Sequence, residues 1–174
     1  NSKKSIVTNQ STTIALDHVA EKYGSSVVRS AVGEINVVNK MKECNALLGR
    51  EGNGGVILAE SHYGRDSLVG VSLFLNRMAQ TNETVKSIFK SMPQYSMIKD
   101  KIELGTLDPK LAIEKIITAF NDASINRMDG IKLLWHDSWI HVRKSNTEPI
   151  IRIYAEAPSK SQAEKLVTKV KLCL

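Results

Sequence analysis

Residues 138–157, "SWIHVRKSNTEPIIRIYAEA", predict a β-hairpin with a polar tip. Side chains alternate between the two faces of a strand, so Ile140 and Val142 share one face and His141 and Arg143 share the other. A run of charged, hydroxyl and amide side chains then separates this strand from a second strand-like run. The hairpin indicates an antiparallel sheet in this half of the chain.

The segments around the hairpin complete a small domain. Strand-like or helical patterns follow one another at residues 95–104 (strand), 108–122 (helix), 130–136 (strand) and 159–174 (helix). With the two strands of the hairpin, the order is β-α-β-β-β-α. Residues 94–174 therefore predict an α+β domain with an antiparallel four-stranded sheet and two helices on one face.

The first 93 residues have a different pattern, in which strand-like and helical segments alternate. Short β-branched or apolar runs at 5–8, 26–32, 46–49 and 55–60 are separated by helical periodicities at 12–24 and 35–45 and followed by helices at 65–80 and 83–92. This alternation favours an α/β layered domain with a mixed, partly parallel sheet. Pro93 marks the boundary between the two predicted domains, 1–93 and 94–174.

Composition excludes several classes of protein. With 42% hydrophobic and 24% charged residues the chain is globular rather than disordered, and no apolar run is long enough to span a membrane. The two cysteines lack partners at metal-binding spacing, which favours a reducing cytoplasm.

The net charge of +6 favours an anionic partner, but the lysines are spread along the sequence and few aromatic residues accompany them. Nucleic-acid binding remains a rival, which a steep loss of oligonucleotide affinity with salt would support.

The hairpin tip carries groups that suit an anion. The guanidinium of Arg143 can bind two phosphate oxygens at once, and that of Arg152 can reach the same loop. Ser145 and Thr147 add hydroxyl donors. Asn146 tolerates a left-handed backbone, which can direct N–H groups toward an anion. From residue types alone, two interpretations remain open: a solvated polar turn and a phosphate socket.

A second loop, "LLGREGNGGVI" at residues 47–57, has four glycines in seven residues. Glycines allow close approach of the backbone to a ligand. The Glu51 carboxylate can accept hydrogen bonds from sugar hydroxyls, and the Asn53 amide can donate or accept. The spacing fits neither a Walker nor a dinucleotide fingerprint, and this loop alone favours a glycine-rich turn.

The two loops together resemble a known family. "RKSNTEPIIRIYAEA" (143–157) is similar to the final-domain phosphate loop of the α-D-phosphohexomutases, and "GREGNGGVI" (49–57) resembles their third-domain sugar loop. The resemblance covers essentially the whole chain and implies the last two domains of such an enzyme, III and IV. These enzymes interconvert hexose 1-phosphates and hexose 6-phosphates (phosphoglucose, phosphomannose or phosphoglucosamine) through a bisphosphate intermediate.

The resemblance also implies roles for individual residues. The phosphate that does not react would be held by Arg143, Ser145, Asn146, Thr147 and Arg152, and the sugar by Glu51, Asn53, Gly33 and Glu34. The chain departs from the family pattern at some of these positions. Asn53 stands where many members have Ser, Gly55 and Glu34 where members have His, and Gln10 roughly where some have Lys.

Two catalytic elements of the family have no counterpart in this sequence. Its reactive phosphoserine loop and its Asp-rich Mg²⁺ loop belong to the first two domains, so no catalytic residue and no metal ligand is expected here. The resemblance implies a fragment of a cytoplasmic enzyme that works with its missing N-terminal domains, Mg²⁺, a phosphorylated hexose and hexose 1,6-bisphosphate as activator. The fragment alone is expected to lack mutase activity. The alternative is a free-standing, non-catalytic module that binds sugar phosphates.

Overall fold

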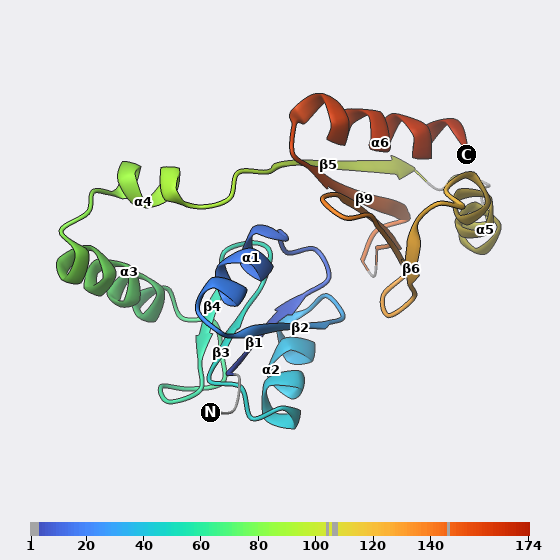
Figure 1. Ribbon diagram of the computed structural model, residues 1–174. Helices are drawn as coiled ribbons and strands as arrows, with labels where there is room; N and C mark the ends of the chain where they lie inside the picture. The colour runs from blue at the N-terminus through green and yellow to red at the C-terminus, as the bar shows by residue number, and fades with distance from the viewer. Residues whose placement is uncertain (1–3, 104, 106–107, 146) are drawn as a thin grey trace. The chain divides into compact units, whose positions relative to one another are not determined.

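The computed structural model describes residues 4–103, 105, 108–145 and 147–174 (Figure 1). The chain divides into two compact units, residues 1–94 and residues 95–174. Each unit has its own sheet and its own cluster of buried apolar side chains. The two units are therefore described separately.

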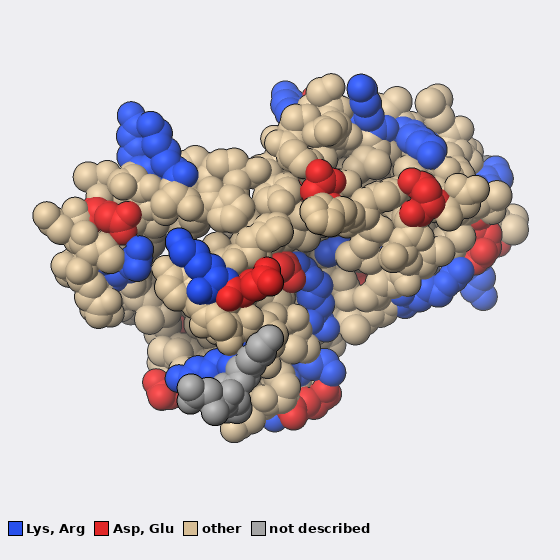
Figure 2. Space-filling view, viewed as in Figure 1, with Lys and Arg blue, Asp and Glu red and all other residues tan. Residues whose placement is uncertain are grey.

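Charged side chains are spread over both units. On the face shown in Figure 2, Lys and Arg form several separate groups, and Asp and Glu side chains lie between them. This distribution agrees with the scattered lysines of the sequence, which carries 24 basic and 18 acidic residues.

The first unit contains a four-stranded mixed sheet with the strand order β2-β1-β3-β4. β1 runs parallel to β2 and β3, whereas β4 runs antiparallel to β3, so the predicted partly parallel sheet is confirmed. The strands are β1 Ser5–Asn9, β2 Ser26–Ser30, β3 Leu48–Arg50 and β4 Val56–Leu58. The helices are α1 Ala15–Lys22, α2 Glu34–Glu43, α3 Ser67–Thr81 and α4 Val85–Ser91.

One face of this sheet packs tightly against α2. The fully buried side chains of Val7 and Ile57 meet those of Val37 and Met41 in a single apolar cluster. The burial of apolar area provides most of the stability of such a layer, at roughly 25 cal/mol per Å². This packing holds β1 and β4 against α2.

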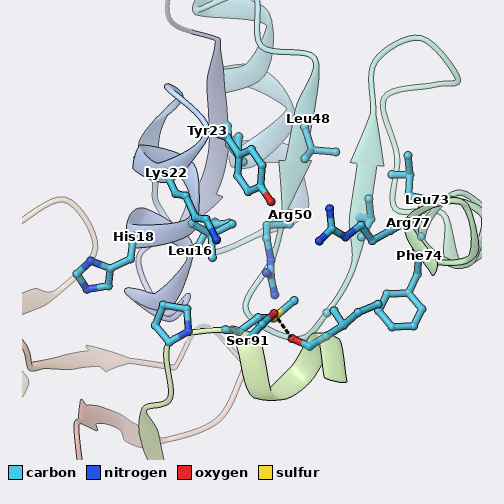
Figure 3. A pocket seen from close by; sticks show the side chains of 18 of the residues that line it. Leu16, His18, Lys22, Tyr23, Leu48, Arg50, Leu73, Phe74, Arg77 and Ser91 are labelled. Carbon is cyan, nitrogen blue, oxygen red and sulfur yellow. Dashed lines mark hydrogen bonds between the residues drawn. The ribbon is translucent and has the colours of Figure 1, made fainter. Parts of the chain in front are cut away.

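The other face of the sheet borders a cavity of about 640 Å³ between α1, α3 and α4 (Figure 3). Leu73 and Phe74 of α3 line it, although α3 buries none of its own residues. Arg50 extends from β3 into this space, and its Nε is buried without a hydrogen-bond partner among the described residues. Burial lowers the pKa of Arg50, because a desolvated guanidinium favours its neutral form.

We expect Arg50→Met to stabilise the protein by about 1 kcal/mol, because it removes a poorly satisfied buried cation and keeps an apolar stem. Urea unfolding followed by circular dichroism measures the change. Arg77→Met is the matched control, since Arg77 lines the same cavity but pairs with Glu83 at 3.0 Å. A loss of stability in Arg50→Met would contradict the expectation.

The second unit contains a five-stranded antiparallel sheet with the strand order β5-β9-β8-β7-β6. Its strands are β5 Ser96–Glu103, β6 Ser124–Asn126, β7 Ile131–Leu134, β8 Trp139–Lys144 and β9 Ile150–Ala157, and its helices are α5 Pro109–Ala119 and α6 Lys160–Leu172. The α+β class is confirmed, but the predicted count of four strands is wrong. β6 has three residues and pairs only at an edge, so no alternation along the sequence reveals it.

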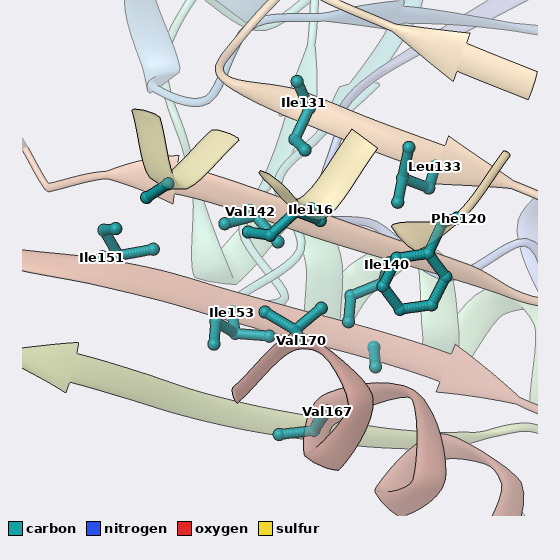
Figure 4. Packing of buried hydrophobic residues seen from close by; sticks show 12 residues of the cluster. Ile116, Phe120, Ile131, Leu133, Ile140, Val142, Ile151, Ile153, Val167 and Val170 are labelled. Carbon is teal, nitrogen blue, oxygen red and sulfur yellow. The ribbon is translucent and has the colours of Figure 1, made fainter. Parts of the chain in front are cut away.

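Both helices of this unit cover the same face of the sheet (Figure 4). Ile116 of α5 and Val170 of α6 belong to one buried cluster with Ile140, Val142 and Ile153 of the strands. The alternation predicted for β8 is therefore confirmed. Trp139, His141 and Arg143 are left on the opposite face.

Candidate functional site

The first candidate site lies at the carboxyl edge of the sheet in residues 1–94. Three parallel strands end there, at Asn9, Ser30 and Arg50, and Glu51 follows β3 directly. The carboxyl ends of parallel strands are where open α/β sheets bind ligands. Gln10, also at this edge, is buried and donates its backbone N–H to the carbonyl of Ser30 at 3.0 Å.

Glu51 is a buried carboxylate with a basic and a polar contact. The residue is only 6% exposed, and its Oε2 lies 3.1 Å from Nη1 of Arg65. The Asn9 amide lies 3.5 Å from the other oxygen, Oε1. A buried carboxylate is stable when such donors and cations surround it. Glu51 is therefore held in one orientation beside the strand ends.

The glycine-rich loop folds into a tight turn around Glu51. The backbone N–H of Glu51 donates to the carbonyl of Gly55 at 3.0 Å, and that of Gly54 donates back to Glu51 at 3.1 Å. The Asn53 side-chain carbonyl accepts from the N–H of Gly55 at 3.1 Å, and Asn53 is exposed. The loop thus forms a rigid hairpin tip that presents the Asn53 amide group at the surface.

Gly33 and Glu34 start α2 next to this loop. Gly33 is the N-cap residue with φ of 123°, and Glu34 is the first helical residue. Nε of Arg65 donates to Oε2 of Glu34 at 2.7 Å, and the Arg65 backbone N–H donates to Oε1 at 3.1 Å. These two contacts hold the pKa of Glu34 below its usual value. Glu34 and Arg65 are therefore an ion pair at neutral pH.

Two of the four predicted sugar-binding residues, Glu34 and Asn53, line one cavity, and Arg65 links this cavity to Glu51. A cavity of about 870 Å³ is lined by Glu34, Asn53, Arg65 and Asp66, with an apolar wall from α3. Asp66 caps α3 by accepting from the N–H of Leu68 at 2.7 Å. Arg65 and Asn9 were missed from the sequence. Neither has a motif of its own, and only the fold brings them to Glu51.

The second candidate site is the tip of the β8–β9 hairpin. Arg143 and Arg152 are register partners on these neighbouring antiparallel strands, so their side chains stand on the same face. Directly opposed like charges destabilise a sheet unless anions offset them. Asp129 accepts from Nε of Arg143 at 3.1 Å, and Glu148 pairs with Arg152. Each of the two guanidiniums is thus paired with one carboxylate.

Two hydroxyl residues complete the described part of this tip. Nε of Arg152 donates to Oγ of Ser145 at 3.3 Å, and the N–H of Thr147 donates to the same oxygen at 3.4 Å. Ser145 is buried, whereas Thr147 is exposed. Asn146, the remaining predicted residue of the loop, lies outside the described residues. The tip of one hairpin therefore carries all four described residues: Arg143 and Arg152 on its strands, and Ser145 and Thr147 in the connection between them.

His141 shares the face of Arg143 but adds no charge to it. Burial lowers the pKa of His141 to about 4, so the ring is neutral at physiological pH. Its Nε2 lies 2.6 Å from the carbonyl oxygen of Asp129. His141 is therefore a fully buried, packed residue of β8.

Two further features bear on the kind of site. Within residues 4–103, 105, 108–145 and 147–174, no three His, Cys, Asp or Glu side chains gather into a group that could hold a metal ion. Among the helices of the described part of the chain, none is both long and apolar enough to cross a membrane.

Comparison with known proteins gives matches along nearly the whole chain. Residues 1–95 match the family model "Phosphoglucomutase/phosphomannomutase, alpha/beta/alpha domain III", and residues 101–172 match "Phosphoglucomutase/phosphomannomutase, C-terminal domain". A phosphoglucosamine/phosphogalactosamine mutase of Sulfurisphaera tokodaii is 35% identical, over 97% of this chain and 38% of the relative. A phosphoglucomutase/phosphomannomutase of Thermococcus kodakarensis is 33% identical, over 92% of this chain and 35% of the relative.

The fold has counterparts among solved structures. A phosphoglucomutase/phosphomannomutase family protein from Burkholderia thailandensis superposes with a TM-score of 0.80 at 21% identity, covering 99% of this chain and 37% of that one. The chain spans 35–38% of the length of the curated relatives named above.

Proposed function

The chain belongs to the phosphoglucomutase/phosphomannomutase family, and we propose from this premise that it binds a phosphorylated hexose through two separate groups of residues. Residues 1–93 recognise the sugar, and residues 94–174 hold the phosphate that does not react. These portions correspond to family domains III and IV.

The observation that carries this proposal is the register pairing of Arg143 with Arg152. Two guanidiniums face the same side of the sheet, each paired with one carboxylate, and their remaining N–H groups could donate to one bound phosphate dianion. Each can contribute a fork of N–H donors, and the hydroxyls of Ser145 and Thr147 lie in the same turn. Asn146 belongs to the proposal through the family resemblance.

The sugar side of the proposal rests on Glu51. A fixed, ionised carboxylate accepts hydrogen bonds from a pair of sugar hydroxyls but gives no favourable contact to phosphate. Asn53 presents an amide group in the same loop, and Glu34, which follows the N-cap residue Gly33, is linked to Glu51 through Arg65. This part of the site therefore suits the neutral ring of the substrate.

For the whole protein, we propose interconversion of hexose 1-phosphate and hexose 6-phosphate through a bisphosphate. Phosphoryl transfer needs positioning and neutralisation of the moving group. This chain supplies positioning, and the family resemblance implies that the reactive serine and the Mg²⁺ ligands belong to other domains; the chain covers only 38% of the Sulfurisphaera tokodaii relative. The names of the relatives favour phosphoglucosamine, phosphoglucose and phosphomannose as candidate substrates. The chain alone is then inactive as a mutase.

Calorimetric titration of the 174-residue chain tests the binding role. Glucosamine 6-phosphate, glucose 6-phosphate and mannose 6-phosphate are compared with inorganic phosphate and with the free hexoses. We expect at least one hexose phosphate to bind more tightly than inorganic phosphate, and free hexoses to bind least. The absence of binding by all three hexose phosphates at millimolar concentration would refute the proposal.

The alternative is a non-catalytic module that binds sugar phosphates. Both possibilities predict the same binding, so the distinction depends on the rest of the gene. An upstream reading frame that encodes a serine loop and an Asp-rich metal loop supports the mutase. A mature protein that consists of these two units alone supports the module.

A further inference from the structure

Arg65 connects three elements that are distant in the sequence. Its backbone is fixed at the start of α3, where the next residue, Asp66, caps the helix and donates its own N–H to the carbonyl of Val56 at 2.8 Å. Its guanidinium then extends to Glu34 on α2 and to Glu51 after β3, at 2.7 and 3.1 Å. The guanidinium therefore lies between two carboxylates.

The two carboxylates differ in their exposure and in the contacts they receive. The Glu34 side chain is 36% exposed and takes both the Nε–H and the backbone N–H of Arg65. The Glu51 side chain is 8% exposed; its Oε2 lies 3.1 Å from Nη1 of Arg65, and its Oε1 receives only a long contact of 3.5 Å from the Asn9 amide. Glu34 thus uses both of its oxygens on Arg65, whereas Glu51 keeps acceptor capacity for another donor.

The path of the Arg65 side chain is also fixed. A Cβ atom at Gly55 would collide with Cδ and Cγ of Arg65, so the stem crosses the glycine-rich loop where the loop has no side chain. Glycine at this position permits the close approach. A planar guanidinium held on both sides can fix a carboxylate in one plane, which a lysine ammonium cannot do.

We infer that Arg65 is a positioning residue that orients Glu51 as the sugar acceptor, and that Glu34 anchors Arg65 instead of contacting the sugar. This inference rests on the proposed sugar-binding role of Glu51. Glu34 then acts on the sugar indirectly. Sugar affinity depends on the contacts that link Glu34 to Arg65 and Arg65 to Glu51.

The inference predicts losses that are specific and non-additive. Arg65→Gln lowers hexose-phosphate affinity about tenfold and leaves inorganic-phosphate affinity unchanged, because phosphate binds in the other unit. Glu34→Gln lowers hexose-phosphate affinity about threefold, and this loss disappears when Arg65 is already replaced by Gln. Arg65→Gln likewise has no further effect in a Glu51→Gln background. Gly55→Ala, which displaces the Arg65 side chain without deleting it, gives the same selective loss.

Titrations of these variants with the best-binding of glucosamine, glucose and mannose 6-phosphates, and with inorganic phosphate, measure the losses. Arg77→Gln, on α3, serves as the control variant. An Arg65→Gln variant with wild-type sugar-phosphate affinity would overturn the inference. The inference would also be overturned if the losses of hexose-phosphate affinity in Glu34→Gln and Arg65→Gln added up in the double variant. Additive losses would mean that Glu34 contacts the sugar directly, independently of Arg65.

A measurement without ligand separates this inference from the proposed function. The ¹³C resonance of the Glu51 carboxylate shifts in Arg65→Gln and Glu34→Gln but not in Arg77→Gln if Arg65 positions Glu51. An unchanged resonance in both variants refutes the positioning role. If the wild type binds no hexose phosphate but these shifts occur, the proposed function fails while the contact chain stands.

Discussion

Arg143→Ala is expected to weaken the binding of hexose phosphate and of inorganic phosphate alike, by about 100-fold. The change removes one of two opposed guanidiniums and with it a pair of charge-assisted hydrogen bonds, which together contribute about 3 kcal/mol. Arg143 is buried to 8% exposure and is tied to Asp129, so it is already held in place before any anion arrives. An anchored donor loses little rotamer entropy on binding.

The control for this prediction is Lys144→Ala. Lys144 is the next residue of β8, carries the same charge, and is exposed where Arg143 is buried. Phosphate affinity should change little in this variant, because an exposed lysine interacts weakly through solvent. The phosphate affinity of Arg143→Lys should lie between those of the wild type and Arg143→Ala, because lysine keeps the charge but lacks the forked N–H donors of the guanidinium.

Calorimetry at one fixed ionic strength checks the three variants, with circular dichroism to confirm that each is folded. The folding control is needed because Arg143→Ala also leaves Asp129 without its cation. A folded Arg143→Ala protein that binds phosphate as tightly as wild type would mean that the hairpin tip is only a solvated turn.

Glu51→Gln is expected to have the second largest effect, a loss of roughly 10- to 30-fold in affinity for hexose phosphates and none for inorganic phosphate. The amide keeps one acceptor but loses the charge that strengthens hydrogen bonds from sugar hydroxyls. Its NH₂ group would also face donors, because Arg65 and Asn9 approach the two carboxylate oxygens. Arg65 keeps its pair with Glu34, so the variant should remain folded.

Glu60→Gln is the matched control for Glu51→Gln. It makes the same chemical change at an exposed acidic residue of the same unit. The informative measurement is the ratio of hexose-phosphate affinity to inorganic-phosphate affinity for each variant. An equal loss for both ligands in Glu51→Gln would point to a general effect on the fold and against a sugar contact.

Much of the second unit could be predicted from the sequence, because its signals are local. Alternation along β8 placed Ile140 and Val142 in the core, and the Ser145–Arg152 segment brought its donors together within one turn. The helices that begin after Asp108 and Ser159 have local signals too, since each cap bonds to a backbone N–H within the next three residues. The count of strands failed at β6, whose three residues have no periodic pattern.

The sugar side of the site was only partly predictable. Glu51 and Asn53 stand out in a glycine-rich loop, but Arg65 looks in the sequence like an ordinary residue before a helix cap. Its partner Glu34 lies 31 residues earlier, and no sequence period links the two. Ion pairs of this kind depend on where two helices begin in space.

The sequence by itself determined the two fold classes, the residue types of both loops and the family that these loops resemble. Periodicity, capping and turn chemistry act over a few residues, so they can be detected along the chain. Only the tertiary structure decided that Arg152 faces Arg143, that Arg65 lies between two carboxylates and that Nε of Arg50 is buried without a hydrogen-bond partner among the described residues. These facts depend on strand register and on the packing of distant elements, and the energies that fix them arise only when the chain is folded.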